Sequence, residues 1–108
     1  MALPEPKDQR ISLTDAAALT RRYREHAGKA AGAEVPKCGL FLRRLIDELL
    51  AQPGCSGMRV YYGRTATGED TFVLVGVDQK GDDMTGGTLL EDPFYCPPFC
   101  STASMLNS

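Results

Sequence analysis

The most constraining feature of the chain is the run TFVLVGV at residues 71–77, which is apolar on both faces of an extended strand. Such a run is typical of the centre of a sheet, where both faces are covered. The preceding run, residues 58–64, alternates between apolar and polar positions and places Met58, Val60 and Tyr62 on one face. A turn-rich segment of hairpin length joins the two runs. Together they predict an antiparallel β-hairpin.

The predicted hairpin needs further cover. A hairpin alone is only marginally stable in water, and its second strand has two apolar faces. Glycines punctuate the chain after the hairpin, and Thr88-Leu89-Leu90 is the next short stretch with strand character. We therefore expect the sheet to gain a third strand from residues 88–90, or to be completed by a second copy of the chain.

Two helices are predicted before the hairpin. The first begins near Ser12, because Ser12 and Asp15 have the spacing of a capping box, and Gly28 and Gly32 end it. The second covers residues 40–51, where apolar positions recur at helical spacing and a Pro-Gly pair follows. Its apolar stripe consists of Phe41, Leu42, Leu45, Ile46, Leu49 and Leu50. We expect this second helix to supply most of the core.

The order of these elements predicts the α+β class. Two helices are followed by an antiparallel β-hairpin, with a third short strand as an option, and then by an extended C-terminal tail rich in proline and cysteine. A chain of 108 residues has the length of one domain. We expect residues 1–10 to be a flexible leader, residues 11–91 to be the single domain, and residues 92–108 to be the tail.

The charges of the chain are segregated, although its formal net charge is only −2. Residues 1–64 carry eleven basic and seven acidic side chains, giving +4, whereas residues 65–108 carry one and seven, giving −6. One interpretation is internal complementarity between the two parts. The alternative is a bipolar surface for self-association or a charged partner. An isoelectric point near 5.3 argues against nucleic acid as the main partner.

Neither a membrane span nor a catalytic motif is recognisable in the sequence. No apolar run approaches the ~20 residues of a transmembrane helix, and the N-terminus lacks the regions of a signal peptide. These features favour a soluble, cytoplasmic protein. The only histidine, His26, has no nucleophile placed beside it by the sequence, and no phosphate-binding glycine motif occurs. The sequence favours a non-catalytic protein without a cofactor.

The tail is the unusual part of the sequence. It contains three of the seven prolines, three of the eight aromatic residues and two of the four cysteines. Prolines favour extended polyproline II backbone. Aromatic side chains are poorly suited to free exposure, so we expect the tail to dock on the domain or on a partner. The candidate binding residues are Tyr95, Cys96, Pro97, Pro98, Phe99 and Cys100.

The four cysteines do not fit a single site. Cys38 and Cys55 flank a predicted helix about 18 Å long, whereas a disulfide needs Cα atoms within about 7 Å. Cys96 and Cys100 could form a disulfide, a thiol pair or half of a metal site. Cys55, these two and His26 would make a Cys₃His set for a structural metal such as zinc, but nothing in the sequence brings His26 close. Alternatively, Cys38 and Cys55 are small apolar fillers and the tail thiols are free.

Several short motifs follow one another in a specific order. They are ISL at 11–13 with TRRYR at 20–24, PGCSGMRVY at 53–61, VGVD at 75–78 with GDDM at 81–84, CPPFC at 96–100 and LNS at 106–108. This order resembles a family of small uncharacterised bacterial proteins with a Cys-Pro-Pro-x-Cys tail, over most of residues 11–108. The resemblance implies a bacterial origin, a genuine tail motif, and a grouping of Cys55, rather than Cys38, with that motif. It implies no activity.

Two classes of function follow from the sequence. The first is a non-catalytic binding or assembly module, which self-associates as a homo-oligomer or docks a protein partner through its sheet or its C-terminal tail. The second is a thiol site, either a metal clip or a redox pair, built from Cys55, Cys96 and Cys100. The incomplete sheet, the segregated charges and the aromatic tail favour the first class.

Overall fold

β3 (Asp70–Val77) is the central strand of a three-stranded antiparallel sheet. The computed structural model describes residues 5–26 and 38–103, and for residues 23, 24 and 26 the backbone alone. Along one edge β3 pairs with β2 (Gly57–Arg64), and along the other with β4 (Leu89–Leu90). The hairpin and the third strand expected from the sequence are confirmed. The central position of β3 explains why its sequence is apolar on both faces.

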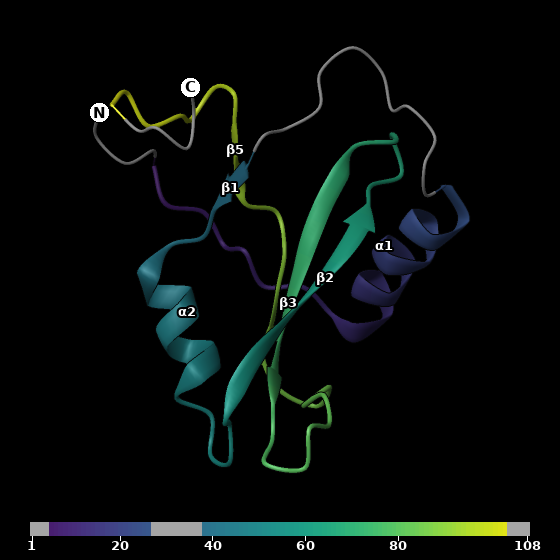
Figure 1. Ribbon diagram of the computed structural model, residues 1–108, viewed down its shortest axis with the longest axis vertical. Coiled ribbons are helices and arrows are strands. Elements are labelled where there is room, and N and C mark those ends of the chain that lie inside the picture. Colours follow the sequence, from purple (N-terminus) through teal and green to yellow (C-terminus); the bar gives the residue numbers. More distant parts are fainter. Residues whose placement is uncertain (1–4, 27–37, 104–108) are drawn as a thin grey trace.

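Two helices, α1 (Leu13–His26) and α2 (Arg43–Leu50), lie on either side of the β2–β3 hairpin (Figure 1). Leu19 of α1 packs in one cluster with Val73 of β3. Val73 and Leu74 are consecutive residues of a strand, so their side chains point to opposite faces. α2 covers the second face, in a cluster made of Leu45, Leu49, Leu74 and Leu90. The second helix therefore supplies half of this main cluster.

α1 begins where its capping signal predicts. The N–H of Asp15 donates to Oγ of Ser12 over 3.1 Å, which satisfies one of the free N–H groups of the first turn. Ala16 and Leu19, one turn apart, form the buried face of the helix. The predicted end at Gly28 and Gly32 lies outside the residues that the structure describes.

α2 is shorter than the predicted helix over residues 40–51. Residues 38–40 form the strand β1 (Cys38–Leu40), which pairs with β5 (Phe94–Cys96) in a separate two-stranded antiparallel sheet. Leu40 lies opposite Phe94 in this ladder, and its carbonyl accepts a hydrogen bond from Nε2 of Gln9 over 3.2 Å, so Leu40 is not part of the helix. The predicted apolar stripe is otherwise kept, because Leu42, Leu45 and Leu49 are buried; Leu50, at the helix end, is exposed.

The segment expected as a leader packs against β4. Gln9 has no exposed surface, and Arg10 forms a β-bridge with Leu90. The backbone N–H of Glu91 donates to the carbonyl of Gln9 over 2.6 Å, and that of Ile11 to the carbonyl of Leu89 over 2.9 Å. Residues 9–11 thus extend the sheet beyond β4, whereas residues 1–4 lie outside the described part. Among the described residues, no helix is long and apolar enough to cross a bilayer.

Candidate functional site

The tail enters the fold as a strand. In the ladder between β1 and β5, Cys38 lies opposite Cys96 and Leu40 lies opposite Phe94. Phe94 and Cys96 are buried, whereas Tyr95 points to the other side of β5 and is half-buried. The hydroxyl of Tyr95 and Oγ1 of Thr71 are hydrogen-bonded over 2.7 Å, and burial raises the pKa of Tyr95. Of the two expected locations of the tail, its own domain or a partner, residues 94–96 lie on the domain.

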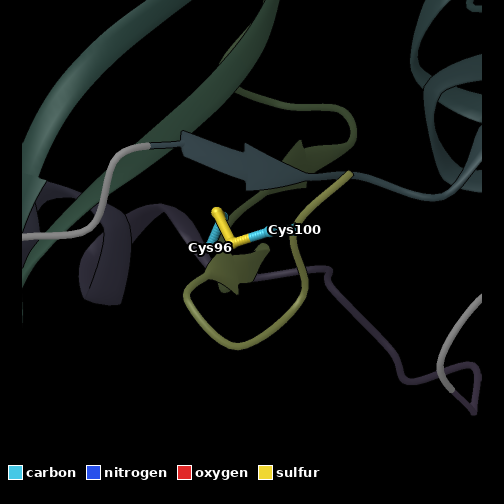
Figure 2. The surroundings of a disulfide bond; sticks show 2 residues. All are labelled: Cys96 and Cys100. Atoms are coloured by element: carbon cyan, nitrogen blue, oxygen red, sulfur yellow. A yellow bond between two sulfur atoms is a disulfide. The ribbon is translucent and has the colours of Figure 1, made fainter. Parts of the chain in front are cut away.

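A tight turn follows β5 and is closed by a disulfide between Cys96 and Cys100 (Figure 2). The Cα atoms of the two cysteines are 4.8 Å apart. The N–H of Phe99 donates to the carbonyl of Tyr95 over 2.9 Å, so the chain reverses across Pro97 and Pro98. The expected polyproline II extension is therefore replaced here by a closed turn.

The turn places Phe99 on the surface beside the start of β5. The rings of Phe94 and Phe99 meet edge to face, with their centroids 5.3 Å apart. Nζ of Lys7 lies 4.3 Å from the centroid of the Phe94 ring, which is within the range of a cation–π contact. A hollow of about 320 Å³ opens between these groups and is lined by Lys7, Glu69, Pro93, Phe94, Tyr95, Pro97, Pro98 and Phe99. Four of the six predicted binding residues line this hollow.

Cys55 occupies a different environment from the tail cysteines. It follows α2 and packs against the cluster of Leu49 and Leu74, and its Sγ lies 3.2 Å from the carbonyl oxygen of Gly57. In Figure 1 the α2–β2 connection and the β1–β5 ladder lie at opposite ends of the hairpin. The structure thus sets Cys38, and not Cys55, beside the tail disulfide. The side chain of His26 lies outside the described part of the chain.

No metal site is visible in the part of the chain that the structure describes. Within residues 5–26 and 38–103, no group of three or more His, Cys, Asp or Glu side chains could hold an ion. The set of Cys55, Cys96 and Cys100 is therefore not assembled as a metal site there. Cys96 and Cys100 are joined to each other, and Cys38 and Cys55 are free thiols.

A second candidate surface lies on β2, the edge strand of the three-stranded sheet. Met58, Val60 and Tyr62 share one face of β2, and their exposed fractions are 38, 50 and 62%. α2 covers this face of the sheet over β3, where Leu74 is buried, but it leaves β2 open. The sequence predicted that these three side chains share a face, and in the part of the chain that the structure describes all three are exposed.

The backbone groups of the same three residues point away from β3. The N–H of Thr65 donates to the carbonyl of Glu69 over 2.8 Å, and this pair continues the β2–β3 register into the turn. Hydrogen-bonded and non-hydrogen-bonded pairs alternate along an antiparallel ladder. Odd-numbered residues of β2 therefore direct their backbone groups toward β3. Even-numbered residues direct theirs to the open edge, and these include Met58, Val60 and Tyr62.

The opposite face of β2 is tied to the β3–β4 connection by Asp83. Nη1 of Arg59 is 2.5 Å from Oδ1 of Asp83, and the hydroxyl of Tyr61 donates to Oδ2 of the same carboxylate. The hydrogen bond to Asp83 is the main cause that raises the pKa of Tyr61. One acidic residue thus holds two side chains of the edge strand, and the charge of Arg59 is neutralised locally.

Comparison with known proteins gives no relative: no family model, no curated protein and no solved structure matches the chain. The resemblance to proteins with a Cys-Pro-Pro-x-Cys tail therefore stays a prediction. The two candidate surfaces of the chain are the edge of β2 and the hollow at the tail.

Proposed function

We propose that the chain is a non-catalytic binding module that associates with a second copy of itself along β2. The observation that carries this proposal is the coincidence, on Met58, Val60 and Tyr62, of exposed apolar side chains and outward-facing backbone groups. A long apolar edge strand is a template for pairing with another strand. Main-chain hydrogen bonds would join the two strands, and burial of the Met58, Val60 and Tyr62 side chains would supply most of the free energy of association.

β2 lacks the residue types that commonly protect an edge strand. Natural edges are blunted by lysine, proline or charges that oppose pairing. Residues 57–64 contain no lysine and no proline, and their two charged residues are arginines. Arg59 is paired with Asp83, and Arg64 is paired with Asp70 over 3.0 Å. A second copy would therefore meet little uncompensated charge along this edge.

Symmetry restricts how two copies can pair. Two copies of β2 become antiparallel neighbours in one sheet only through a two-fold axis perpendicular to that sheet. Directly opposed residues in a ladder have side chains on the same face. The two opposed residue numbers must therefore be both even or both odd. The axis then passes midway between two copies of the same residue, which opposes itself. For the greatest overlap of residues 57–64, this residue is 60 or 61.

The register centred on Val60 pairs the exposed side chains of Met58, Val60 and Tyr62 with apolar side chains of the second copy. Val60 would oppose Val60 of the second copy, and Met58 would oppose Tyr62 of the second copy. Centring on Tyr61 would instead oppose Met58 to Arg64, a residue whose buried guanidinium is held by Asp70. We therefore propose the first register, because it opposes only apolar side chains on the face that carries Met58, Val60 and Tyr62.

Light scattering on three proteins tests the proposal. We expect the wild-type chain to show the mass of a dimer and Val60→Lys to show the mass of a monomer. Two lysines would face each other at the axis, and like charges directly opposite are destabilising. The side chain of Val60 is half exposed, so the substitution should leave the fold intact, as circular dichroism can check. Phe99→Lys is the matched control on the tail and should stay a dimer.

Cross-linking with a short bifunctional thiol reagent tests the register. In a background of Cys38→Ser and Cys55→Ala, Val60→Cys should cross-link to itself, whereas Met58→Cys should react only when mixed with Tyr62→Cys. A wild-type chain that is a monomer from micromolar to millimolar concentration, or a Val60→Lys variant that keeps the dimer mass, would contradict the proposal.

The tail is the second candidate surface, and the hollow beside Phe99 is the observation that favours it. Its walls combine three aromatic residues with Lys7 and Glu69, which suits an apolar side chain of a partner protein or of a second copy. The same three proteins separate the two surfaces. If association is lost in Phe99→Lys and kept in Val60→Lys, the tail carries the function in place of β2.

A further inference from the structure

We propose that Cys38, Cys96 and Cys100 form a thiol–disulfide exchange site, in which the sulfur of Cys96 can bond to either of the other two. Cys96 is bonded to Cys100 in the structure, and Cys38 is a free thiol directly opposite Cys96 in the β1–β5 ladder. The proposal does not depend on association through β2. It rests on the ladder, which joins two segments 58 positions apart in the sequence.

The distances of a regular ladder suit both pairings. Opposed residues of an antiparallel pair have Cα atoms about 4.5 to 5.5 Å apart and side chains on the same face. Disulfides span Cα separations of about 4.4 to 6.8 Å. The Cα atoms of Cys96 and Cys100 are 4.8 Å apart, within the same range. Cys96 therefore has two partners at disulfide distance, one along the turn and one across the ladder.

The exposure of the three residues assigns them different roles. Cys38 is exposed, Cys100 is partly exposed, and Cys96 is 1% exposed. Solvent and reagents reach Cys38 first, so it is the attacking thiol. Cys96 is the shared central sulfur, shielded by the strand in which it sits. Cys100 lies in the turn beyond the strand and is the leaving group.

The exchange needs no added oxidant or reductant. The thiolate of Cys38 attacks Sγ of Cys96, the Cys38–Cys96 bond forms, and the Cys96–Cys100 bond breaks. Cys100 leaves as a thiolate and takes up the proton that Cys38 released to solvent. One thiol and one disulfide are present before and after the step, so electrons and atoms balance.

Exchange would change the surface of the tail. The Cys96–Cys100 bond closes the turn that holds Phe99 against Phe94 and forms one wall of the tail hollow. With Cys96 bonded to Cys38, β1 and β5 are locked together, while residues 97–100 are released from the ring. The cysteine to which Cys96 is bonded would thus determine whether the tail hollow is present.

Mapping of free thiols by alkylation and peptide mass spectrometry tests the exchange. The full chain carrying Cys55→Ser is held under nitrogen at rising pH, quenched in acid and alkylated. We expect alkylation of Cys38 alone at first, and then alkylation of Cys100 with an equal loss of the Cys96–Cys100 peptide. Cys38→Ser is the matched control and should keep Cys100 protected at every pH.

A second variant tests whether Cys38 and Cys96 lie close enough to bond, independently of the exchange. Cys100→Ser, oxidised with glutathione disulfide at low protein concentration, should form the Cys38–Cys96 bond within one chain and leave Cys55 free. If Cys38 and Cys96 do not bond in this variant, the proposed geometry is wrong. If they bond there, but Cys100 is never alkylated in the chain with Cys38, Cys96 and Cys100 intact, the two disulfides do not exchange and the proposal also fails.

Discussion

Gln9 and Leu42 are joined by a hydrogen bond in which the N–H of Leu42 donates to Oε1 of Gln9 over 3.0 Å. The same amide group donates through Nε2 to the carbonyl of Leu40, over 3.2 Å, and to that of Asp92, over 3.1 Å. One side chain thus joins the N-terminal segment to the end of β1, the start of α2 and the connection between β4 and β5. No side chain of α2 caps its own N-terminus, so Gln9 performs that task from a distance.

Replacement of Gln9 by alanine should destabilise the fold strongly. The substitution removes three hydrogen bonds and leaves one N–H and two carbonyl groups without this partner, at a cost of about 3 kcal/mol. Urea unfolding followed by circular dichroism would measure the loss. Gln79→Ala is the control, because Gln79 is exposed, and it should change stability by less than about 0.5 kcal/mol. Equal midpoints for the two variants would show that the amide network is not stabilising.

The elements that the sequence predicted well are those with local signals. Residues 71–77 carry their own apolar pattern, and Ser12 lies three residues before the N–H that it caps. β1 and β5 carry no such signal, because each has three residues and their pairing depends on a contact between distant segments. Gln9 also escaped prediction, since a polar residue between charged ones gives no sign of burial.

The candidate sites also divide into features with a local sequence signal and features that depend on contacts between distant segments. The C-x-x-x-C spacing of the tail is local, and the structure closes it as a disulfide. The position of Cys38 opposite Cys96 depends on the β1–β5 ladder, so no local pattern in the sequence places Cys38 beside the tail. Alternation in β2 predicted which side chains share a face. Whether a helix covers that face depends on where α2 packs, and this is a property of the whole fold.

Gly39→Ala should destabilise the small sheet that holds the tail. A Cβ at Gly39 would lie 2.6 Å from Cβ and 2.7 Å from Cγ of Pro93, so the strand or the proline must move. Overpacking of this kind costs about 2 kcal/mol. Gly86→Ala, where a Cβ meets no atom within 4 Å, is the control for the intrinsic effect of the change. Thermal unfolding should show a lower midpoint for Gly39→Ala alone; equal midpoints would argue against close packing of β1 on Pro93.

Asp70→Asn should cost more stability than Asp47→Asn, although each removes one carboxylate from an arginine pair. Nε and Nη2 of Arg64 both donate to Oδ1 of Asp70, over 3.1 and 3.0 Å, and the side chain of Arg64 is only 8% exposed. Loss of this charged acceptor should cost about 2 kcal/mol. The pair of Arg43 and Asp47 lies on the surface of α2, and its loss should cost less than about 0.5 kcal/mol. Denaturant unfolding of both variants checks this order, and similar losses would contradict it.

Glu91→Gln should stabilise the protein at neutral pH and lose that advantage in acid. Burial is the main cause that raises the pKa of Glu91 above its ordinary value of 4.5, and the neighbouring charge of Asp92 adds to it. The folded state therefore holds the proton more tightly than the unfolded state, and wild-type stability must fall as the pH rises from about 4.5 through the folded pKa. The side-chain amide that replaces the carboxyl in Glu91→Gln does not titrate, so the variant avoids this loss.

Unfolding of the wild type and of Glu91→Gln, measured from pH 3 to pH 8, tests this dependence. The two curves should meet below the ordinary pKa of 4.5, where the carboxyl is protonated in both states, and separate above it in favour of the variant. Glu91→Asp keeps a carboxyl at this position and should retain a dependence of the same sign. A variant less stable than the wild type at pH 8 would mean that the ionised Glu91 makes a favourable contact, and that its desolvation does not dominate.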